Sequence, residues 1–297
     1  MNTRQSFGNV TQLPQFIRAM DRDNLLADPL LQQICKPWIN AKSLEASQLT
    51  PSGCPMEISF RTSGARVFTF EPDVATKSPA LKWKRISALS DMSPDSHPML
   101  MELASQPDQS WGAWLGVRSS KGNCRFKVYQ EITKHSLLNV SRRIATAISK
   151  SEGLCPKIFG FDGVQEEYYC RIEQPGFDSI HRLLSVVGAG IHSLEVCLLL
   201  AELAGRRPEE LFREVPLGIS YRFVDNRATA ATLFIHATSI SADHNLMTRR
   251  IMHVAREIGG ASNFDTVLDH WRPAWSTLAL TVDAETIQFA AGCGLLT

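Results

Sequence analysis

The sequence lacks an apolar run of about 18 residues, the length that a membrane-spanning helix needs. Its first residues, MNTRQSFGNVTQLPQ, lack the apolar stretch of a signal peptide. Because 31 Lys and Arg face 30 Asp and Glu, the net charge is only +1, and no bulk attraction to nucleic acid or to an acidic membrane is expected. These absences predict a cytoplasmic protein that binds neither nucleic acid nor membrane.

Cysteine shows no pattern that would bind a metal. Seven cysteines are scattered along the chain without a C-x-x-C pair, which predicts reduced thiols and no structural zinc site. The sequence also has no G-x-x-x-x-G-K-[ST], no H-E-x-x-H and no G-x-S-x-G, and no G-x-G-x-x-G follows a strand. The common signatures of nucleotide binding, zinc proteolysis and serine hydrolysis are therefore missing.

What the sequence does contain is a repeated pair of strand-like segments. Alternating apolar and polar residues flank turn residues in five hairpins, at about 54–72, 111–132, 156–175, 216–239 and 275–296. Helical periodicity fills the segments between them, for example SLLNVSRRIATAISKSEG, SLEVCLLLAELAGRRPEELF and NLMTRRIMHVAREIGG. Residues 1–50 also have helical spacing, so we expect an N-terminal helical segment there.

This order predicts an α/β fold in one domain, residues 1–297. Hairpins that alternate with helices cannot form a parallel sheet, because the two strands of each hairpin are antiparallel. Ten antiparallel strands built from five ββα-type repeats can close into a barrel with the helices outside, and such a barrel is wide enough to hold a ligand. The alternative is an α+β domain with one open, twisted sheet.

Short motifs along this pattern resemble those of the ABBA or PT-barrel prenyltransferases, and most of all the cyanobactin prenyltransferases, which modify ribosomal peptides. In chain order they are QFIR, CPMEIS at 54–59, ARVFTFEPD at 65–73, RFKVY at 125–129, FGFD at 159–162 and LFIH at 233–236. The resemblance implies a PT-barrel that transfers an isoprenyl group from its diphosphate to an acceptor. Such a reaction needs cations around the leaving group, aromatic faces around the allylic cation and a carboxylate that accepts a proton.

The resemblance assigns these tasks to residues on the hairpins. Glu57 matches the general base, and Arg66 and Lys127 match the diphosphate-binding positions. Arg171 is a third candidate for another reason, because its spacing of two residues puts it on the same face as Tyr169. We expect the Glu57 face of the first strand and the Arg66 face of the second to be shared, so that neighbouring cations lower the pKa of Glu57. The alternatives are that Glu57 only forms an ion pair with Arg66, and that the strand cations are solvated.

Candidate side chains for shielding the isoprenoid are aromatic or lie beside aromatics on the strands: Tyr129, Tyr169, Phe68, Tyr221, Phe234, His236 and Phe289. His236 has the alternative of a hydrogen-bonded core histidine. The segments LFIHAT and IQFAAGC carry phenylalanine, isoleucine and small residues where the resembling enzymes carry tyrosine. The donor is therefore left open between dimethylallyl and geranyl diphosphate.

The resemblance also suggests the partners. The acceptor would be a side chain (Tyr, Trp, Ser/Thr, His or Arg) of a cyclic or linear ribosomal peptide. A closed barrel has no obvious need for a partner, so we expect a monomer. Because no D-D-x-x-D motif is present, magnesium would be carried by the diphosphate. Two alternatives are a prenyltransferase for small aromatic molecules and a non-catalytic barrel that binds a hydrophobic or phosphorylated ligand. The enzyme requires Glu57, Arg66 and Lys127 to point into the barrel.

Overall fold

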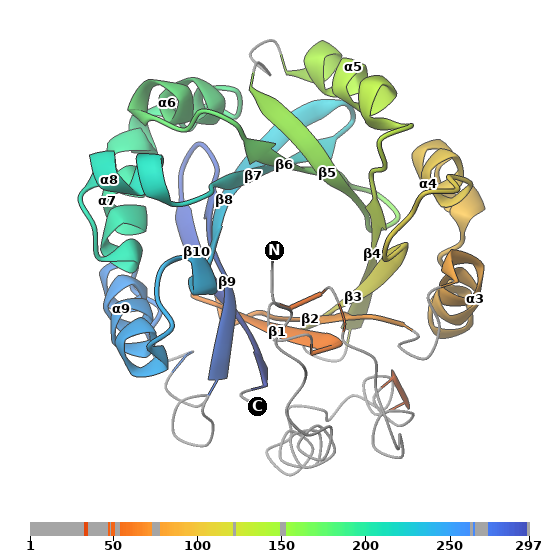
Figure 1. The fold of residues 1–297 in the computed structure, drawn as a ribbon, viewed down its shortest axis with the longest axis horizontal. Coiled ribbons are helices and arrows are strands. Elements are labelled where there is room, and N and C mark those ends of the chain that lie inside the picture. Colours follow the sequence, from red (N-terminus) through yellow and green to blue (C-terminus); the bar gives the residue numbers. More distant parts are fainter. Residues whose placement is uncertain are drawn as a thin grey trace.

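The protein forms a closed barrel of ten antiparallel strands with helices around it (Figure 1). The computed structural model describes residues 33–34, 47, 49–50, 54–72, 78–120, 123–148, 153–261, 264 and 273–295. Neighbouring strands in the chain pair with one another, and the first strand closes the ring by pairing with the last. The predicted ten-stranded barrel is confirmed, and the open-sheet alternative is wrong.

All five predicted hairpins are present. They are β1 (Met56–Arg61) with β2 (Arg66–Phe70), β3 (Ala113–Ser120) with β4 (Asn123–Glu131), β5 (Leu154–Phe161) with β6 (Glu166–Ile172), β7 (Gly218–Val224) with β8 (Arg227–His236), and β9 (Pro273–Val282) with β10 (Ile287–Leu295). Because the strands alternate in direction around the ring, all five hairpin turns lie at one end of the barrel, here called the turn end. The connections through helices meet the opposite end, here called the helix end.

The helices cover the outside of the barrel (Figure 1). They are α3 (Pro79–Leu89), α4 (Pro98–Ala104), α5 (Leu137–Ala147), α6 (Phe177–Ser185), α7 (Ser193–Ala204), α8 (Pro208–Glu214) and α9 (His244–Glu257). The second helical segment of the sequence forms two helices, because Gly205 takes a left-handed conformation with φ of 60° and ends α7. None of the described helices combines the length and apolar character needed to cross a membrane. The helical segment predicted for residues 1–50 lies almost wholly outside the described residues.

The barrel wall has an apolar outer face and a polar inner face. Tyr221 on β7 points outward, because its hydroxyl donates to the carbonyl of Leu183 on α6 at 3.0 Å. Side chains alternate along a strand, so Ser220 and Arg222 point inward. The hydrophobic core consists of outer-face residues, such as Phe60 at 1% exposure, packed against the surrounding helices. The inner face is therefore left for side chains that can act on a ligand.

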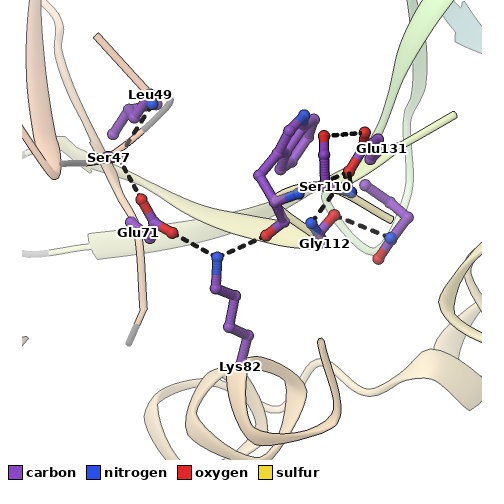
Figure 2. Close-up of polar contacts among 9 residues, drawn as sticks. Ser47, Leu49, Glu71, Lys82, Ser110, Gly112 and Glu131 are labelled. Atoms are coloured by element: carbon purple, nitrogen blue, oxygen red, sulfur yellow. Dashed lines mark hydrogen bonds and ion pairs between the residues drawn. The ribbon is translucent and has the colours of Figure 1, made fainter. Parts of the chain in front are cut away.

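A buried ion pair fastens α3 to the helix end of the barrel, as Figure 2 shows. Lys82 on α3 pairs with Glu71, which directly follows β2, and also donates to the carbonyl of Trp111 at 2.6 Å. The Glu131 carboxylate at the end of β4 accepts the backbone N–H groups of Trp111 at 2.9 Å and Gly112 at 3.2 Å. These contacts fix the segment that leads into β3.

Candidate active site

The strand register brings Glu57 and Lys127 to the same face of the barrel wall. Across neighbouring strands, Glu57 lies opposite Thr69, Thr69 opposite Gly116, and Gly116 opposite Lys127. Residues that are directly opposite in an antiparallel pair share a face. Ser220, which points inward, donates a hydrogen bond to Glu167, and Glu167 forms an ion pair with Lys127. Glu57 and Lys127 therefore both point into the barrel.

Hydroxyl groups surround the Glu57 carboxylate. Ser276 and Thr277 both donate to Oε2, the latter at 3.2 Å, and Ser59 donates to Oε1 at 3.4 Å. A register shift in the β9–β10 pairing places Ser276 and Thr277 together opposite Gly292, so that two consecutive side chains reach one carboxylate. Burial raises the pKa of Glu57 against the effect of these hydrogen bonds. The expectation that cations lower this pKa is wrong.

A second inner-face carboxylate holds Lys127. The ammonium of Lys127 pairs with Glu167 on β6 and donates to the hydroxyl of Tyr169 at 3.1 Å. It also lies 5.1 Å from the ring centroid of Tyr129 and 5.3 Å from that of Tyr169, within the range of cation–π attraction. Ser220 donates a further hydrogen bond to Glu167. Lys127 is thus held among aromatic rings and a carboxylate.

Three arginines join Lys127 on the inner face near the turn end. Arg61 ends β1, and Arg118 and Arg222 lie close to the turns that follow β3 and β7. None of them forms an ion pair within 4.0 Å with the part of the chain that the structure describes, and the buried Arg61 Nε has no hydrogen-bond partner there. Burial lowers the pKa of Arg61, and the charges of Arg118 and Arg222 lower it further. The turn end of the barrel is therefore rich in unpaired positive charge.

Aromatic rings line the wall next to this charge. Tyr129 and Tyr169 meet edge to face with ring centroids 5.8 Å apart, and Phe234 on β8 lies 6.2 Å from Tyr169. Two of these rings lie over inner-face glycines. A Cβ atom at Gly116 would be 2.8 Å from Tyr129, and one at Gly218 would overlap Phe234. The inner face therefore carries both aromatic rings and the cationic side chains of Lys127 and the three arginines.

Arg66 and Phe68 do not face the inside, which corrects two predictions. Phe60 lies opposite Arg66 and Ile58 opposite Phe68, so both residues share the outer face of those core residues. Phe68 is 1% exposed and stacks on Phe70 with ring centroids 6.3 Å apart. The proposed ion pair between Glu57 and Arg66 is excluded for the same reason. The requirement that Arg66 point into the barrel is therefore not met, and the arginines on the inner face are Arg61, Arg118 and Arg222.

Tyr221 and Phe289 are also corrected from isoprenoid shield to outer core. The hydroxyl of Tyr221 bonds to α6, as described above. Phe289 alternates with Gln288 and Ala290, which face inward, and it stacks on Phe264 with ring centroids 5.7 Å apart. Both rings stabilise the contact between the barrel and its outer layer and lie on the far side of the wall from Glu57.

Arg171 and His236 lie at the edges of the inner face. Arg171 shares the face of Tyr169 but lies near the helix end of β6, is exposed, and forms no hydrogen bond or ion pair with described residues. His236, the last residue of β8, is cross-strand neighbour to Thr277 and is exposed, so it is not a core histidine. His236 is therefore near Glu57, because its neighbour Thr277 donates a hydrogen bond to Glu57. Arg171 lies toward the opposite end of the barrel from Arg222.

Sequence reasoning missed most of the charged residues on the inner face. Arg118, Arg222, Glu167 and the uncharged Ser276 were not identified, and Arg61 was not assigned a role. Arg222 could have been found, since it is flanked by the aromatic residues Tyr221 and Phe223 in an alternating strand. Among the described residues, no group of three or more His, Cys, Asp or Glu could hold a metal ion.

No protein-family model and no curated protein matches the sequence, but solved structures identify the fold. It is the PT-barrel of the ABBA prenyltransferases. The 5-dimethylallyltryptophan synthase from Streptomyces coelicolor matches with a TM-score of 0.72 at 15% sequence identity, over 97% of this chain and 98% of that chain.

Two further structures with this fold contain ligands. The 6-dimethylallyltryptophan synthase from Micromonospora olivasterospora, in complex with DMASPP and Trp, has a TM-score of 0.72 at 16% identity over 97% of each chain. NotF in complex with brevianamide F and DMSPP has a TM-score of 0.58 at 11% identity, over 99% of this chain and 96% of that chain. At such identities the likeness defines the fold alone.

Proposed function

We propose that this protein is a prenyltransferase that binds dimethylallyl diphosphate at the turn end of its barrel. The observation that carries this proposal is the group of inner-face arginines, Arg61, Arg118 and Arg222, that have no ion-pair partner among the described residues. Half-buried cations that form no ion pair fit a ligand with several negative charges. The DMASPP and DMSPP complexes of proteins with the same fold support a diphosphate in this role.

The cations would stabilise the leaving group. When the C1–O bond of the donor breaks, the electron pair stays on the diphosphate oxygen and an allylic cation remains. Guanidinium and ammonium groups stabilise the developing negative charge more strongly in a low-dielectric site than in water. The faces of Tyr129, Tyr169 and Phe234 would shield the allylic cation from water and attract it through their ring electrons.

Glu57 lies toward the helix end of β1, where it would act on the acceptor. Glu57 and Arg61 are four residues apart on one strand, which corresponds to roughly 13 Å, enough for a C5 chain and an aromatic ring between them. An aromatic carbon of the acceptor attacks C1, and the proton released from that carbon passes to the Glu57 carboxylate. Because burial raises the pKa of Glu57, it is a stronger base than an exposed glutamate.

The acceptor that we favour is a small aromatic molecule, and an indole in particular. Trp and brevianamide F are bound in structures with this fold. The cyclic ribosomal peptide suggested by the cyanobactin resemblance is supported only by short motifs, and it becomes an outcome of the test below. Geranyl diphosphate is a second candidate donor, because Phe234 lies opposite the small residue Ala279 on the inner face, and Ala279 lies opposite Ala290. We propose that any magnesium accompanies the diphosphate.

Intact mass spectrometry tests this function. The protein is incubated with dimethylallyl or geranyl diphosphate and with tryptophan, an indole-containing cyclic dipeptide, or linear and cyclic peptides, each with Mg²⁺ and with EDTA. A gain of one isoprene unit on tryptophan or the dipeptide supports the proposal, and fragmentation locates the new bond. A gain only on larger peptides would restore the peptide acceptor. No gain on any acceptor, with a folded protein, would contradict a prenyltransferase of these substrates.

A further inference from the structure

Glu167 places a negative charge inside the cationic part of the barrel. It lies on the inner face of β6, directly opposite Arg222 on β7, and is 7% exposed. One carboxylate oxygen pairs with Lys127 and the other accepts a hydrogen bond from Ser220. A site that binds a diphosphate through cations does not need this carboxylate, so its presence requires a separate explanation.

The charge of Glu167 persists at neutral pH. Burial by itself would raise its pKa, but Lys127 and Arg222 outweigh burial and hold the pKa at about 2. The carboxylate is also near enough to Arg61 to oppose the lowering of the pKa of that arginine. Its effect therefore extends from Lys127 on β4 to cations on β1 and β7. Any anion bound by these residues would be repelled by Glu167.

Lys127 is the residue for which Glu167 and a diphosphate would compete. An ammonium has three N–H donors, and Glu167 and Tyr169 accept two of them. The third is available for a first contact with an arriving anion. If Lys127 then turned fully toward that anion, Ser220 would still donate to Glu167, so the carboxylate would keep one partner.

We propose that Glu167 is a built-in competitor for Lys127 that weakens the binding of the diphosphate donor and of the pyrophosphate product. This inference rests on the proposed function. Four cations without a carboxylate would hold pyrophosphate tightly, and product release limits turnover in many enzymes. By re-forming its pair with Lys127, Glu167 favours the departure of pyrophosphate. It is thus a residue that tunes affinity and does not itself react.

Calorimetric titration with inorganic pyrophosphate tests the competition. We expect Glu167→Gln to bind pyrophosphate about tenfold more tightly than the wild type, because one nearby negative charge is removed. Glu166→Gln is the matched control: Glu166 is the preceding residue and faces outward, where it contacts His97 and Tyr168. This control should leave the affinity unchanged.

A second variant and a double variant complete the test. Glu167→Ala also removes the charge and should tighten binding, which keeps the test open if Glu167→Gln does not fold. Combining Lys127→Met with Glu167→Gln should cancel most of the gain in pyrophosphate affinity, because the ammonium group that Glu167→Gln releases is then missing. Unchanged or weaker pyrophosphate binding in the folded Glu167 variants would overturn the competition.

The outcomes also separate this inference from the proposed function. Prenyl transfer by the wild type without tighter binding by the Glu167 variants overturns the inference alone. Tighter binding by these variants without prenyl transfer by the wild type supports the competition for an anion and overturns the transferase. No pyrophosphate binding by the wild type or by any folded variant overturns both.

Discussion

Gly292 on β10 leaves the space that the carboxyl group of Glu57 on β1 occupies: a Cβ atom on residue 292 would lie 2.7 Å from Cδ of Glu57. That separation is shorter than carbon atoms tolerate, so an alanine there must displace the carboxylate. Such a displacement would also break its hydrogen bonds with Ser276 and Thr277. The position of the proposed base thus depends on a residue of another strand that has no side chain.

The first prediction is that Gly292→Ala lowers kcat by about 10- to 100-fold, because small misplacements of a reacting group are costly. Pyrophosphate affinity should stay within about twofold, since the cations lie near the turn end. Gly176→Ala is the control, as a Cβ atom there meets nothing within 4 Å. Steady-state kinetics and titration of both variants measure the effects. An equal loss of pyrophosphate binding would mean that the barrel as a whole is distorted.

The second prediction concerns Glu57 as a base. Glu57→Gln should reduce kcat by about 10²-fold or more while pyrophosphate affinity is kept. A base acts when ionised, and burial raises the pKa of Glu57, so wild-type kcat should increase with pH through a pKa above the ordinary value for glutamate. In the Glu57→Gln variant this rise of kcat with pH should be absent. If kcat of Glu57→Gln still rises with pH in the same way, another group accepts the proton.

The number and order of the hairpins were predictable because their signals are local. Alternating residues and turn residues such as Asp162-Gly163 lie within single hairpins, and all five were located. The face of each strand was harder to assign, as Arg66 illustrates. A two-residue turn at Ser63-Gly64 would place Arg66 opposite Arg61, but the observed loop places it opposite Phe60. One residue in the register moves every side chain to the other face.

The inner-face charges were unpredictable for a different reason. Arg61, Arg118 and Arg222 lie on three strands that are far apart in the sequence, and only closure of the barrel directs them into one space. Glu167 has a neighbour, Glu166, with identical chemistry but the opposite orientation, so the sequence alone cannot separate the two carboxylates. Lys127 was singled out by its match to a family motif, which supplied information that its own strand does not contain; the structure places it on the inner face, and its role in binding the diphosphate stays a prediction.

The third prediction compares an inner with an outer arginine. Arg222→Gln should weaken pyrophosphate binding by about tenfold or more, because it removes a charge from the proposed anion site. Arg66→Gln makes the same chemical change on the outer face and should alter binding by less than about twofold. Titration calorimetry at one fixed salt concentration measures both. A larger effect for Arg66 would reassign the anion site to the outside of the barrel.

The fourth prediction concerns the buried ion pair of Lys82 and Glu71 (Figure 2). Lys82→Met leaves the Glu71 carboxylate buried without its cation, and breaking such a pair costs about 3–5 kcal/mol in the free energy of unfolding. Lys84→Met on the exposed side of the same helix is the control and should change it by less than about 0.5 kcal/mol. Urea unfolding measures these differences.

A double variant shows whether the loss comes from the uncompensated charge. Adding Glu71→Gln to Lys82→Met removes the carboxylate, and most of the lost stability should return because no buried charge remains. If the double variant is as unstable as Lys82→Met, the lysine stabilises α3 mainly through its hydrogen bond to the Trp111 carbonyl at 2.6 Å. In that case the segment leading into β3, and not the ion pair, determines how α3 is held against the barrel.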